Sequence, residues 1–582
     1  MQTLRVPGRS GPARPRNKRL RLPRPRAQRL VQALSLTLFL GLLAAAFANL
    51  ASPVAENLFL RLDPLVALGT ALSARDIPVG IVPGLLMLAL VPLLGRLFCG
   101  WVCPMGATVD CADSLLARRR RLPGSLRQIK YWLLALVLGS ALLGVSLVFL
   151  AAPMPLVTRL WGLLVYPLAA MGIEKALPLM RPVADVLDIR TLLFLEVKAP
   201  FFATMGFVAV FFGLVFAASR LSPRFWCRYV CPAGASLALL SRRPVWRRRV
   251  SEKCIECGKC QRACPMQAIA DDPHTTRHGE CILCRACAGV CPTGAIDFPA
   301  SLHVLESQIV QPTMAGRRAV LAAGATGAAG LVVGGLGLAA PLHAATVRPP
   351  GSAPEDEFLS RCMRCGQCAV ACPTNIIQPA WFSSGVLGVF SPTLTPVRGF
   401  CDPHCHECGK ACPTLAIRTL PSQERVWAKL GTAEVNRETC LAWKDKKKCL
   451  VCDEVCPYGA VELKPEPGNP VYVPHVDEKR CAGCGYCEHF CPVRPARAIR
   501  VGSKDQIRLS SGSLESAAKA KGLSLSLKQD KTWGIPAGSE DHGLPPGFSP
   551  LEESSTPGAG SEPLPPGFSP LEPEPAGGKS SS

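Results

Sequence analysis

The chain has 582 residues, 29 of them cysteine, with 48% hydrophobic residues and a formal net charge of +23. It is too long for a single hydrophobic core, so several domains are expected. The cysteines stand in tight groups of four, most of them followed by proline, which argues against a disulfide scaffold and indicates metal clusters. The arginine runs lie beside apolar stretches, which favours membrane topology over nucleic acid as the reason for the charge.

Residues 1–30 are basic, contain no acidic residue and carry several prolines. We expect a disordered tail that its charge holds in the cytoplasm. A cleaved signal peptide is the less favoured alternative, because no small-residue cleavage site clearly follows the apolar run.

Residues 31–250 are expected to form an α-helical membrane domain. Four apolar runs in it are long enough to cross a bilayer core of roughly 30 Å. These runs are 31–50, 78–98, 131–153 and 200–218. The loops at 99–130 and 219–250 are basic, so both ends of the domain are expected in the cytoplasm. The run 155–172 contains Arg159 and is expected to be interfacial or re-entrant rather than a fifth span.

Two copies of one motif follow the second and the fourth apolar run. They are CGWVCPMG, with Cys99 and Cys103, and CRYVCPAG, with Cys227 and Cys231. The repetition indicates an internal duplication, and we expect the four cysteines to converge as a redox-active or metal-binding thiol set. The alternative is that Pro and Gly end each helix while the cysteines pack as small apolar residues. Cys111 is expected to be an ordinary buried cysteine.

Residues 251–297 contain two C-x2-C-x2-C-x3-C-P motifs, which are the signature of a bacterial ferredoxin domain with two [4Fe–4S] clusters. In such domains the fourth cysteine of each motif binds the cluster of the other motif. We therefore expect one cluster on Cys254, Cys257, Cys260 and Cys291, and a second on Cys281, Cys284, Cys287 and Cys264.

Residues 355–500 contain four further groups and are expected to form a four-cluster domain of the same α+β type. The groups are Cys362, Cys365, Cys368 and Cys372; Cys401, Cys405, Cys408 and Cys412; Cys440, Cys449, Cys452 and Cys456; and Cys481, Cys484, Cys487 and Cys491. The second and third groups have longer first gaps, where a loop can bulge without moving the last three ligands. By order, we pair the first group with the second and the third with the fourth, which brings the predicted total to six [4Fe–4S] clusters.

Zinc and haem are the alternatives to iron–sulfur. Structural zinc usually takes two separated C-x2-C pairs, unlike these triple-cysteine runs. Cys405 and His406 resemble part of a c-type haem motif, but the gap from Cys401 is one residue too long. His404 and His406 lie beside cluster ligands; we expect solvated loop residues, with tuning of a cluster as the alternative.

The residues quoted above resemble two known kinds of ferredoxin-type protein joined in one chain. Residues 1–300 resemble the NapH-type membrane ferredoxins of periplasmic nitrate respiration, on the apolar runs, the motifs CGWVCPMG and CRYVCPAG and the paired groups. Residues 314–500 resemble the exported, four-cluster NapG-type ferredoxins. MauN and MauM of methylamine utilisation are similar to the same two halves.

The resemblance implies that residues 314–346 are a twin-arginine export signal, with Arg317 and Arg318, that is either cleaved or kept as a fifth membrane segment. Gly316 ahead of the arginines and the lack of a following Lys depart from the usual motif. Residues 355–582 would then lie in the periplasm and 251–297 on the cytoplasmic side of the inner membrane. Residues 505–582 repeat LPPGFSPLE and are expected to be a disordered tail, with the repeat either a docking motif or a neutral duplication.

The function that the resemblance implies is that of the electron-transfer component of a quinol dehydrogenase, rather than a stand-alone enzyme. Its partners would be the membrane, the quinone pool, the twin-arginine export machinery and a periplasmic reductase or multihaem cytochrome, with no nucleic acid. One alternative is a maturation or regulatory factor for a periplasmic metalloenzyme, which would handle metals or thiols. Another is a passive ferredoxin scaffold. No residues in the sequence evidently connect the two cluster sets across the bilayer.

Overall fold

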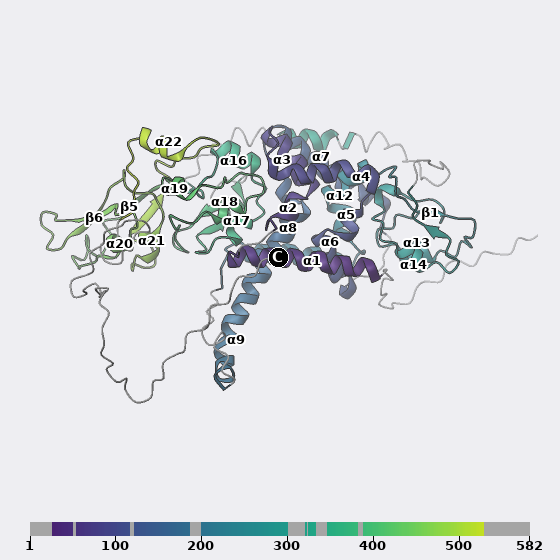
Figure 1. Cartoon of the computed structure of the whole chain (residues 1–582), viewed down its shortest axis with the longest axis horizontal. Coiled ribbons are helices and arrows are strands. Elements are labelled where there is room, and N and C mark those ends of the chain that lie inside the picture. The colour runs from purple at the N-terminus through teal and green to yellow at the C-terminus, as the bar shows by residue number, and fades with distance from the viewer. Residues whose placement is uncertain are drawn as a thin grey trace, which may run out of the picture. The chain divides into compact units, whose positions relative to one another are not determined.

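The structure is a computed structural model of the whole chain. It describes residues 26–50, 54–116, 122–186, 199–300, 321–322, 324–332, 346–381 and 388–528. The arginine pair of the expected export signal and the repeat-bearing tail beyond 528 lie outside the described residues. The described chain comprises a helical domain, residues 26–248, a first cysteine-rich domain, residues 249–297, and a second cysteine-rich domain, residues 346–528 (Figure 1).

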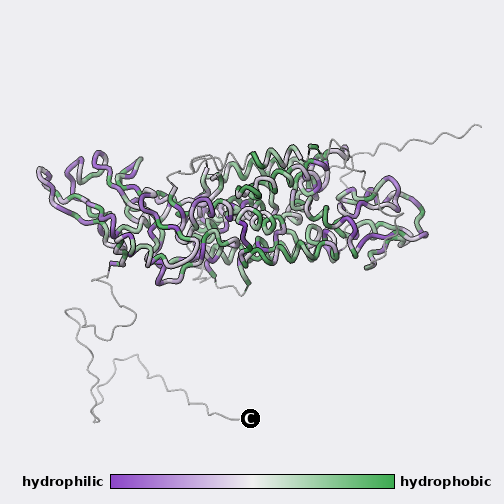
Figure 2. Tube along the Cα trace, turned by 90° about the horizontal axis from the view of Figure 1, so that it is seen from above, coloured by the Kyte–Doolittle hydropathy of each residue, from purple (hydrophilic) through white to green (hydrophobic). Residues whose placement is uncertain are grey.

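The helical domain holds most of the apolar residues, which Figure 2 shows along its helices. Its helices commonly begin with proline, whose missing N–H group costs nothing in the first turn. Asp63 caps the third helix by accepting from the backbone N–H groups of Leu65 and Val66. The elements are α1 (Arg26–Ala48), α2 (Leu58–Arg61), α3 (Pro64–Ala74), η1 (Val79–Ile81), α4 (Val82–Leu94), α5 (Leu97–Trp101), α6 (Pro104–Leu116), η2 (Gly124–Gln128), α7 (Ile129–Leu142), η3 (Val148–Leu150), α8 (Pro153–Thr158), η4 (Arg159–Val165), α9 (Tyr166–Val186), α11 (Met205–Ala218), η5 (Trp226–Val230) and α12 (Pro232–Leu240).

The prediction of four membrane spans is not confirmed. Among the described residues, two helices are long and apolar enough to be candidate spans, Arg26–Ala48 and Pro153–Pro182. The first overlaps the predicted run 31–50. The other three predicted runs contain only the shorter helices α4, α7 and α11. The glycine Gly95, at a positive φ of 62°, ends α4, because its backbone cannot continue the helix.

Residues 155–172, expected to be interfacial or re-entrant, lie inside the continuous helical run of α8, η4 and α9, which forms the second candidate span by length and hydropathy. Arg159 argued against a span because of its charge. In the structure it is buried, and its Nε and Nη2 atoms donate to the carbonyl oxygen of Arg364 at 2.9 and 2.7 Å. The guanidinium group of Arg159 therefore contacts the second cysteine-rich domain and is not exposed on the surface of the helix.

The first cysteine-rich domain is closed by one short antiparallel pair, β1 (Arg249–Val250) and β2 (Ile296–Asp297), which joins its two ends. Between them lie α13 (Lys259–Ala263), η6 (His278–Glu280) and α14 (Ala286–Gly289). This mixture of short helices and strands agrees with the predicted α+β class.

The second cysteine-rich domain has three antiparallel strand pairs. Thr432 lies opposite Gly502 and Val435 opposite Ile499, so one pair joins the middle of the domain to its last strand. The pairs are β3 (Ile377–Pro379) with β4 (Pro392–Leu394), β5 (Thr432–Val435) with β8 (Ile499–Gly502), and β6 (Val461–Lys464) with β7 (Val473–Val476). The helices are α16 (Glu355–Arg361), α17 (Gln367–Val370), α18 (Glu407–Lys410), α19 (Ser422–Arg425), α20 (Val451–Glu454), α21 (Tyr486–Phe490) and α22 (Leu514–Ala520).

The start of the C-terminal tail also differs from the prediction. The tail was expected from residue 505, but the folded domain continues to 528 and contains α22. Leu514, Ala518 and Leu525 are buried in it. A few apolar side chains at helical spacing therefore anchor a segment whose composition alone indicates disorder.

Both cysteine-rich domains contact the helical domain through buried polar groups. Lys130 Nζ contacts Glu280 Oε1 at 2.6 Å, and Arg96 Nη1 contacts Glu280 Oε2 at 3.2 Å. Burial alone would raise the pKa of Glu280, but the charges of Lys130 and Arg96 hold it below its ordinary value. At the second domain, Ser73 Oγ donates to the carbonyl oxygen of Ser360 at 2.6 Å.

Candidate iron–sulfur sites

In the first cysteine-rich domain, the structure brings together cysteines of both motifs. One cavity of about 20 Å³ is lined by Cys264 from the first motif and by Cys281, Cys284 and Cys287 from the second. Cys254, Cys260 and Cys291 contribute to a common apolar cluster beside β1 and β2, while Cys257 is exposed. The fourth cysteine of one motif thus lies with the first three of the other, as the spacing predicts.

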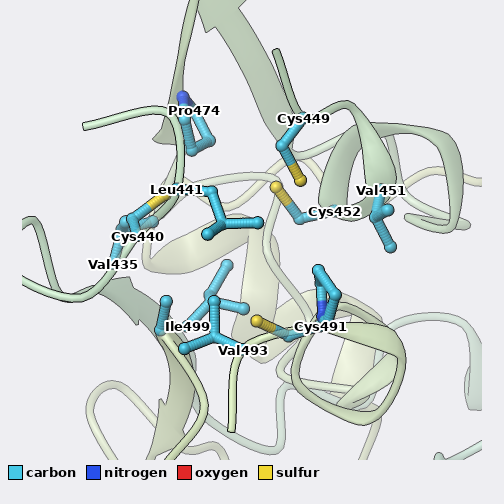
Figure 3. A pocket seen from close by; sticks show the side chains of 12 residues that line it. Val435, Cys440, Leu441, Cys449, Val451, Cys452, Pro474, Cys491, Val493 and Ile499 are labelled. Carbon is cyan, nitrogen blue, oxygen red and sulfur yellow. The ribbon is translucent and has the colours of Figure 1, made fainter. Parts of the chain in front are cut away.

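The second domain repeats this arrangement around three cavities. The cavity in Figure 3 is lined by Cys440, Cys449 and Cys452 from one group and Cys491 from the next, together with apolar side chains such as Val493. The other two sets are Cys372, Cys401, Cys405 and Cys408, and Cys456, Cys481, Cys484 and Cys487. The structure therefore has the order of pairing that we predicted, first group with second and third with fourth.

The remaining set of the second domain is Cys362, Cys365, Cys368 and Cys412. Burial raises the pKa of Cys365 to about 12, and the neighbouring thiols of Cys412 and Cys362 add to the increase. The thiols of Cys365, Cys362 and Cys412 likewise raise the pKa of Cys368, so the four cysteines are neighbours. Thiolates are the form that binds metal, and four buried thiolates this close together would need a cation to balance their charge.

The local backbone explains why these short loops place three cysteines around one cavity. A residue with positive φ precedes the short helix that carries the third cysteine: Gly366 at 83° and Gly485 at 86° in the second domain. This conformation reverses the chain and favours glycine. The sulfur of the fourth cysteine accepts an N–H bond from four residues onward, from Ala268 to Cys264 and from Ala460 to Cys456, both at 3.3 Å.

Buried arginines accompany the cysteine groups, and the sequence analysis did not identify them. Arg425 Nη2 donates to the Sγ atom of Cys401 at 2.9 Å. Arg248 lines the cavity of the first domain, and within the described part of the chain its Nε and Nη2 atoms have no hydrogen-bond partner. A buried cation beside thiolates stabilises an anionic group. The histidines near the second group are peripheral: His404 is exposed, and His406 Nδ1 lies 3.3 Å from the carbonyl oxygen of His404.

The donor sets fit polynuclear iron–sulfur clusters better than zinc or haem. Within the described part of the chain, which includes all the cysteines, no three His, Cys, Asp or Glu groups converge closely enough for a single metal ion. A structural zinc site requires four donors around one point. Four thiols spread around a small apolar cavity instead suit a cluster, whose irons are each bound by a different cysteine. Cys401 and Cys405 share such a cavity with Cys408, which leaves no separate haem pair.

The two motifs of the helical domain also meet. A further cavity of about 20 Å³ is lined by Cys99, Cys103, Cys227 and Cys231, so these four cysteines converge as expected. Cys111 does not: it is exposed, and the prediction of a buried cysteine was wrong. Most of the other residues of α6 are buried in the helical domain, so the exposed Cys111 lies on the face of α6 that does not pack into it.

Two arginines complete this motif, and they are functional candidates that sequence reasoning missed. Arg96 stands three residues before Cys99, and Arg224 stands three residues before Cys227. Both guanidinium groups are fully buried. The internal duplication is therefore longer than the two cysteines and the proline, and aligning the repeats over ten residues reveals it.

Comparison with known protein families agrees with this chemistry. The family described as "4Fe-4S binding domain" matches residues 77–123 and 204–253. Two families described as "4Fe-4S dicluster domain" match residues 253–295 and 446–494, and residues 277–376. No solved structure is similar at a significant level.

Several curated proteins are similar to part of the chain. The methylamine utilization ferredoxin-type protein MauM of Paracoccus denitrificans is 39% identical over 218 residues, which cover 34% of this chain and 93% of that protein. The ferredoxin-type protein NapG of Escherichia coli is 34% identical over 196 residues, covering 32% and 82% respectively. The ferredoxin-type protein NapF of the same organism is 32% identical over 147 residues, covering 25% and 80%. The chain therefore belongs to the MauM/Nap-like family of ferredoxin-type iron–sulfur proteins.

Proposed function

We propose that this protein is anchored in the bacterial inner membrane and carries electrons from quinol to a periplasmic reductase or multihaem cytochrome. Six [4Fe–4S] clusters, two in the first cysteine-rich domain and four in the second, would supply reversible one-electron chemistry. The chain's own residues hold the clusters, exclude water from them and connect the two domains. The finer proposal is a NapH-type membrane part joined to a NapG-type exported part.

The observation that carries the proposal is an apolar helical domain in direct contact with two iron–sulfur domains. Leu30 and Leu34 of α1 are each 61% exposed, and Leu86 of α4 is 60% exposed. On α11, Val210 and Leu214 are 64% and 67% exposed. Helices of soluble domains turn most such side chains inward, whereas large apolar side chains exposed on several helices favour a lipid or protein neighbour. With the candidate spans, this surface supports membrane attachment.

The order of the cysteine groups supports conduction through the second domain. Cys372 is the last cysteine of the first group in the sequence, but it lines the cavity formed by the second group. This exchange makes the first two sites neighbours. The backbone N–H of Cys401 donates to the carbonyl oxygen of Cys484 at 2.8 Å, which joins the first pair to the second. In the same way, Cys456 of the third group lines the cavity of the fourth group, and Cys491 of the fourth group lines the cavity of the third. The four sites are therefore consecutive neighbours rather than separate stores of iron.

Reduction by quinol tests the proposed donor. Membranes that contain the protein would be mixed with a reduced quinol under anaerobic conditions, and the bleaching of the cluster absorbance near 400 nm would be followed. We expect bleaching within the time of a respiratory turnover, and no bleaching when the same quinol is added to membranes without the protein. Clusters that stay oxidised with quinol but are bleached by dithionite would contradict the quinol dehydrogenase function.

Reporter fusions at residues 300 and 355 test the proposed sidedness. The first is expected to report the cytoplasm and the second the periplasm. If both report the cytoplasm, delivery of electrons to a periplasmic acceptor is excluded, although an electron-transfer role in the cytoplasm would survive.

A further inference from the structure

The cavity in the helical domain closely resembles the cluster cavities of the cysteine-rich domains. It is lined by four cysteines, and its volume of about 20 Å³ equals that of the cavities beside Cys264 and Cys372. Its wall is otherwise apolar, with Phe98 and Trp226 among the lining residues. All four cysteines are free thiols in the structure, so they are not joined as disulfides.

The two repeats hold their second cysteines in matching geometry. The N–H groups of Gly106 and Gly234 donate to the Sγ atoms of Cys103 and Cys231 at 3.4 and 3.3 Å. Each of these cysteines immediately precedes the first residue of a helix, α6 or α12. The positive end of a helix dipole and an N–H donor both stabilise a thiolate. The fourth cysteines of the ferredoxin motifs accept N–H bonds of the same length.

The first cysteines of the repeats are placed by an equally matched turn. The N–H of Cys103 donates to the carbonyl oxygen of Phe98, and that of Cys231 to the carbonyl oxygen of Trp226, both at 2.9 Å and both across five residues. Cys99 lies within this wide turn in the first repeat, and Cys227 lies within it in the second. Such π-type turns are rare and are concentrated at functional sites. Both repeats therefore adopt an uncommon backbone geometry that presents two thiols to the same cavity.

Each repeat also sends its arginine across to the other repeat. Arg224 Nη1 donates to the carbonyl oxygen of Cys99 at 3.1 Å. Arg96 Nη2 lies 2.8 Å from the position that a Cβ atom on Gly234 would occupy, so only glycine leaves room for it. The site is consequently shared by the two repeats and is incomplete in either one.

The two arginines differ in how their charge is balanced. Arg224 forms two hydrogen bonds with the carboxylate of Asp110, from Nε at 2.7 Å and from Nη2 at 2.5 Å. Arg96 contacts Glu280 through Nη1 only, while its Nε and Nη2 atoms are buried without a partner among the described residues. Arg96 lines the cavity. A buried guanidinium group with two unpaired N–H positions at a cavity of four thiols indicates that the cavity holds an anionic group.

The spacing of these thiols matches that of the cluster sites. Among the described residues, no three His, Cys, Asp or Glu side chains converge closely enough for one metal ion, either here or at the six ferredoxin-type groups. The thiols of the helical domain are thus spaced like those of the cluster sites, around a volume rather than around a point. The match of residues 77–123 and 204–253 to the family described as "4Fe-4S binding domain" covers both repeats and supports the same conclusion.

The cavity adjoins the first cysteine-rich domain and shares an extended apolar core with the second. On one side, Cys99 packs against the apolar cluster that contains Cys284, and the Nε1 atom of Trp101 donates to the carbonyl oxygen of Leu283 at 3.2 Å. On the other side, Cys103 and Cys231 belong to one apolar core with Cys365 of the second domain. The four thiols therefore lie beside the first set of cluster sites, and one continuous apolar core extends from them to the second set.

We infer that Cys99, Cys103, Cys227 and Cys231 bind a seventh iron–sulfur cluster, which connects the two sets of clusters through the helical domain. The assignment of ligands stands by itself, and the connecting role rests on the electron-transfer function proposed above. In that role one electron enters the site from a reduced [4Fe–4S] cluster and one leaves to an oxidised cluster, so no bond forms or breaks and no proton moves. This supplies the connection between the cluster sets that the sequence does not reveal.

Iron content tests the inference without any assay of turnover. The full-length chain would be purified anaerobically in detergent as the wild type, as the double variant Cys103→Ala/Cys231→Ala and as the control Cys111→Ala. Iron and acid-labile sulfide per chain would be measured, with Mössbauer spectra of protein enriched in ⁵⁷Fe. We expect the double variant to lose about four iron atoms per chain, as removal of one [4Fe–4S] cluster predicts, and the control to lose none.

Three results would overturn the inference: an unchanged iron content in the double variant, a disulfide among the four cysteines of the purified wild type, or one zinc or copper ion per chain at this site. If the double variant fails to fold, the wild type decides by itself, since about 28 iron atoms per chain support a seventh cluster and about 24 exclude it. None of these results depends on reduction by quinol, so failure of the seventh cluster is distinguishable from failure of the proposed function.

Discussion

Replacing Glu280 by Gln is expected to loosen the first cysteine-rich domain from the helical domain. The Glu280 side chain is 9% exposed, and the side chains of its partners Lys130 and Arg96 are fully buried. Gln keeps the size and can still accept a hydrogen bond, but it leaves two buried cations without their counter-charge. Removing one partner of a buried ion pair costs about 3–5 kcal/mol. That range corresponds to an opening equilibrium raised roughly 100- to 4,000-fold.

Hydrogen exchange of the intact protein measures this opening directly. Amides of η6 and of the first turn of α7 should exchange faster in the Glu280→Gln variant by that factor, while those of the second cysteine-rich domain should not change. Glu252→Gln is the matched control, because Glu252 is exposed in the same domain and surface substitutions usually change stability by less than about 0.5 kcal/mol. Equal exchange in the Glu280→Gln variant and the wild type would refute the view that this ion pair holds the domains together.

Three further outcomes follow from the described contacts. Arg425→Met should lower the reduction potential of the cluster at Cys401, because the reduced state loses a cation 2.9 Å from its sulfur ligand; an EPR redox titration showing no shift would contradict this. Gly330→Leu should detach residues 324–332 from α7, because a Cβ atom at position 330 would lie 2.4 Å from a carbonyl oxygen of that helix. The control Gly324→Leu should not, because a Cβ atom at position 324 meets no atom within 4 Å. Cysteine cross-linking between the segment and α7 distinguishes the two variants. Asp63→Ala should lower the free energy of unfolding of the helical domain by about 1–2 kcal/mol, because the N-cap of α3 is lost. An unchanged melting temperature would show that the cap does not stabilise the domain.

The cysteine groups were predictable because their chemistry is local. In a motif such as the one at Cys481, three ligands lie within seven residues, so the spacing itself limits the geometry that the loop can adopt. The exchange of fourth cysteines was predictable for the same reason, since a motif that binds three corners of a cluster leaves its last cysteine for a neighbour. The extra residue after Cys401 did not disturb this, because it adds to a gap outside the last three ligands.

The helical domain was less predictable, because the hydropathy of a segment predicts how buried it is but not which other part of the protein contacts each side chain. The charge of Arg159 indicated an interfacial position, but in the fold its guanidinium group is buried and donates to a carbonyl oxygen of the second cysteine-rich domain. Cys111 appeared buried by composition, yet it lies on the exposed side of α6. The tail beyond 505 has the composition of a disordered segment, but Leu514 finds a buried position in the folded domain. In each case a residue distant in sequence decides the outcome.

The sequence by itself determined the family, the iron–sulfur chemistry and the grouping of the ferredoxin cysteines, since ligands that lie close together along the chain require no knowledge of the fold. Only the tertiary structure decided that two motifs more than 120 residues apart in the chain close around one cavity. It also decided that the buried guanidinium groups of Arg96 and Arg224 contact carboxylates from other elements. Convergence and charge balance are properties of distance in space, and they become visible only when the chain is folded.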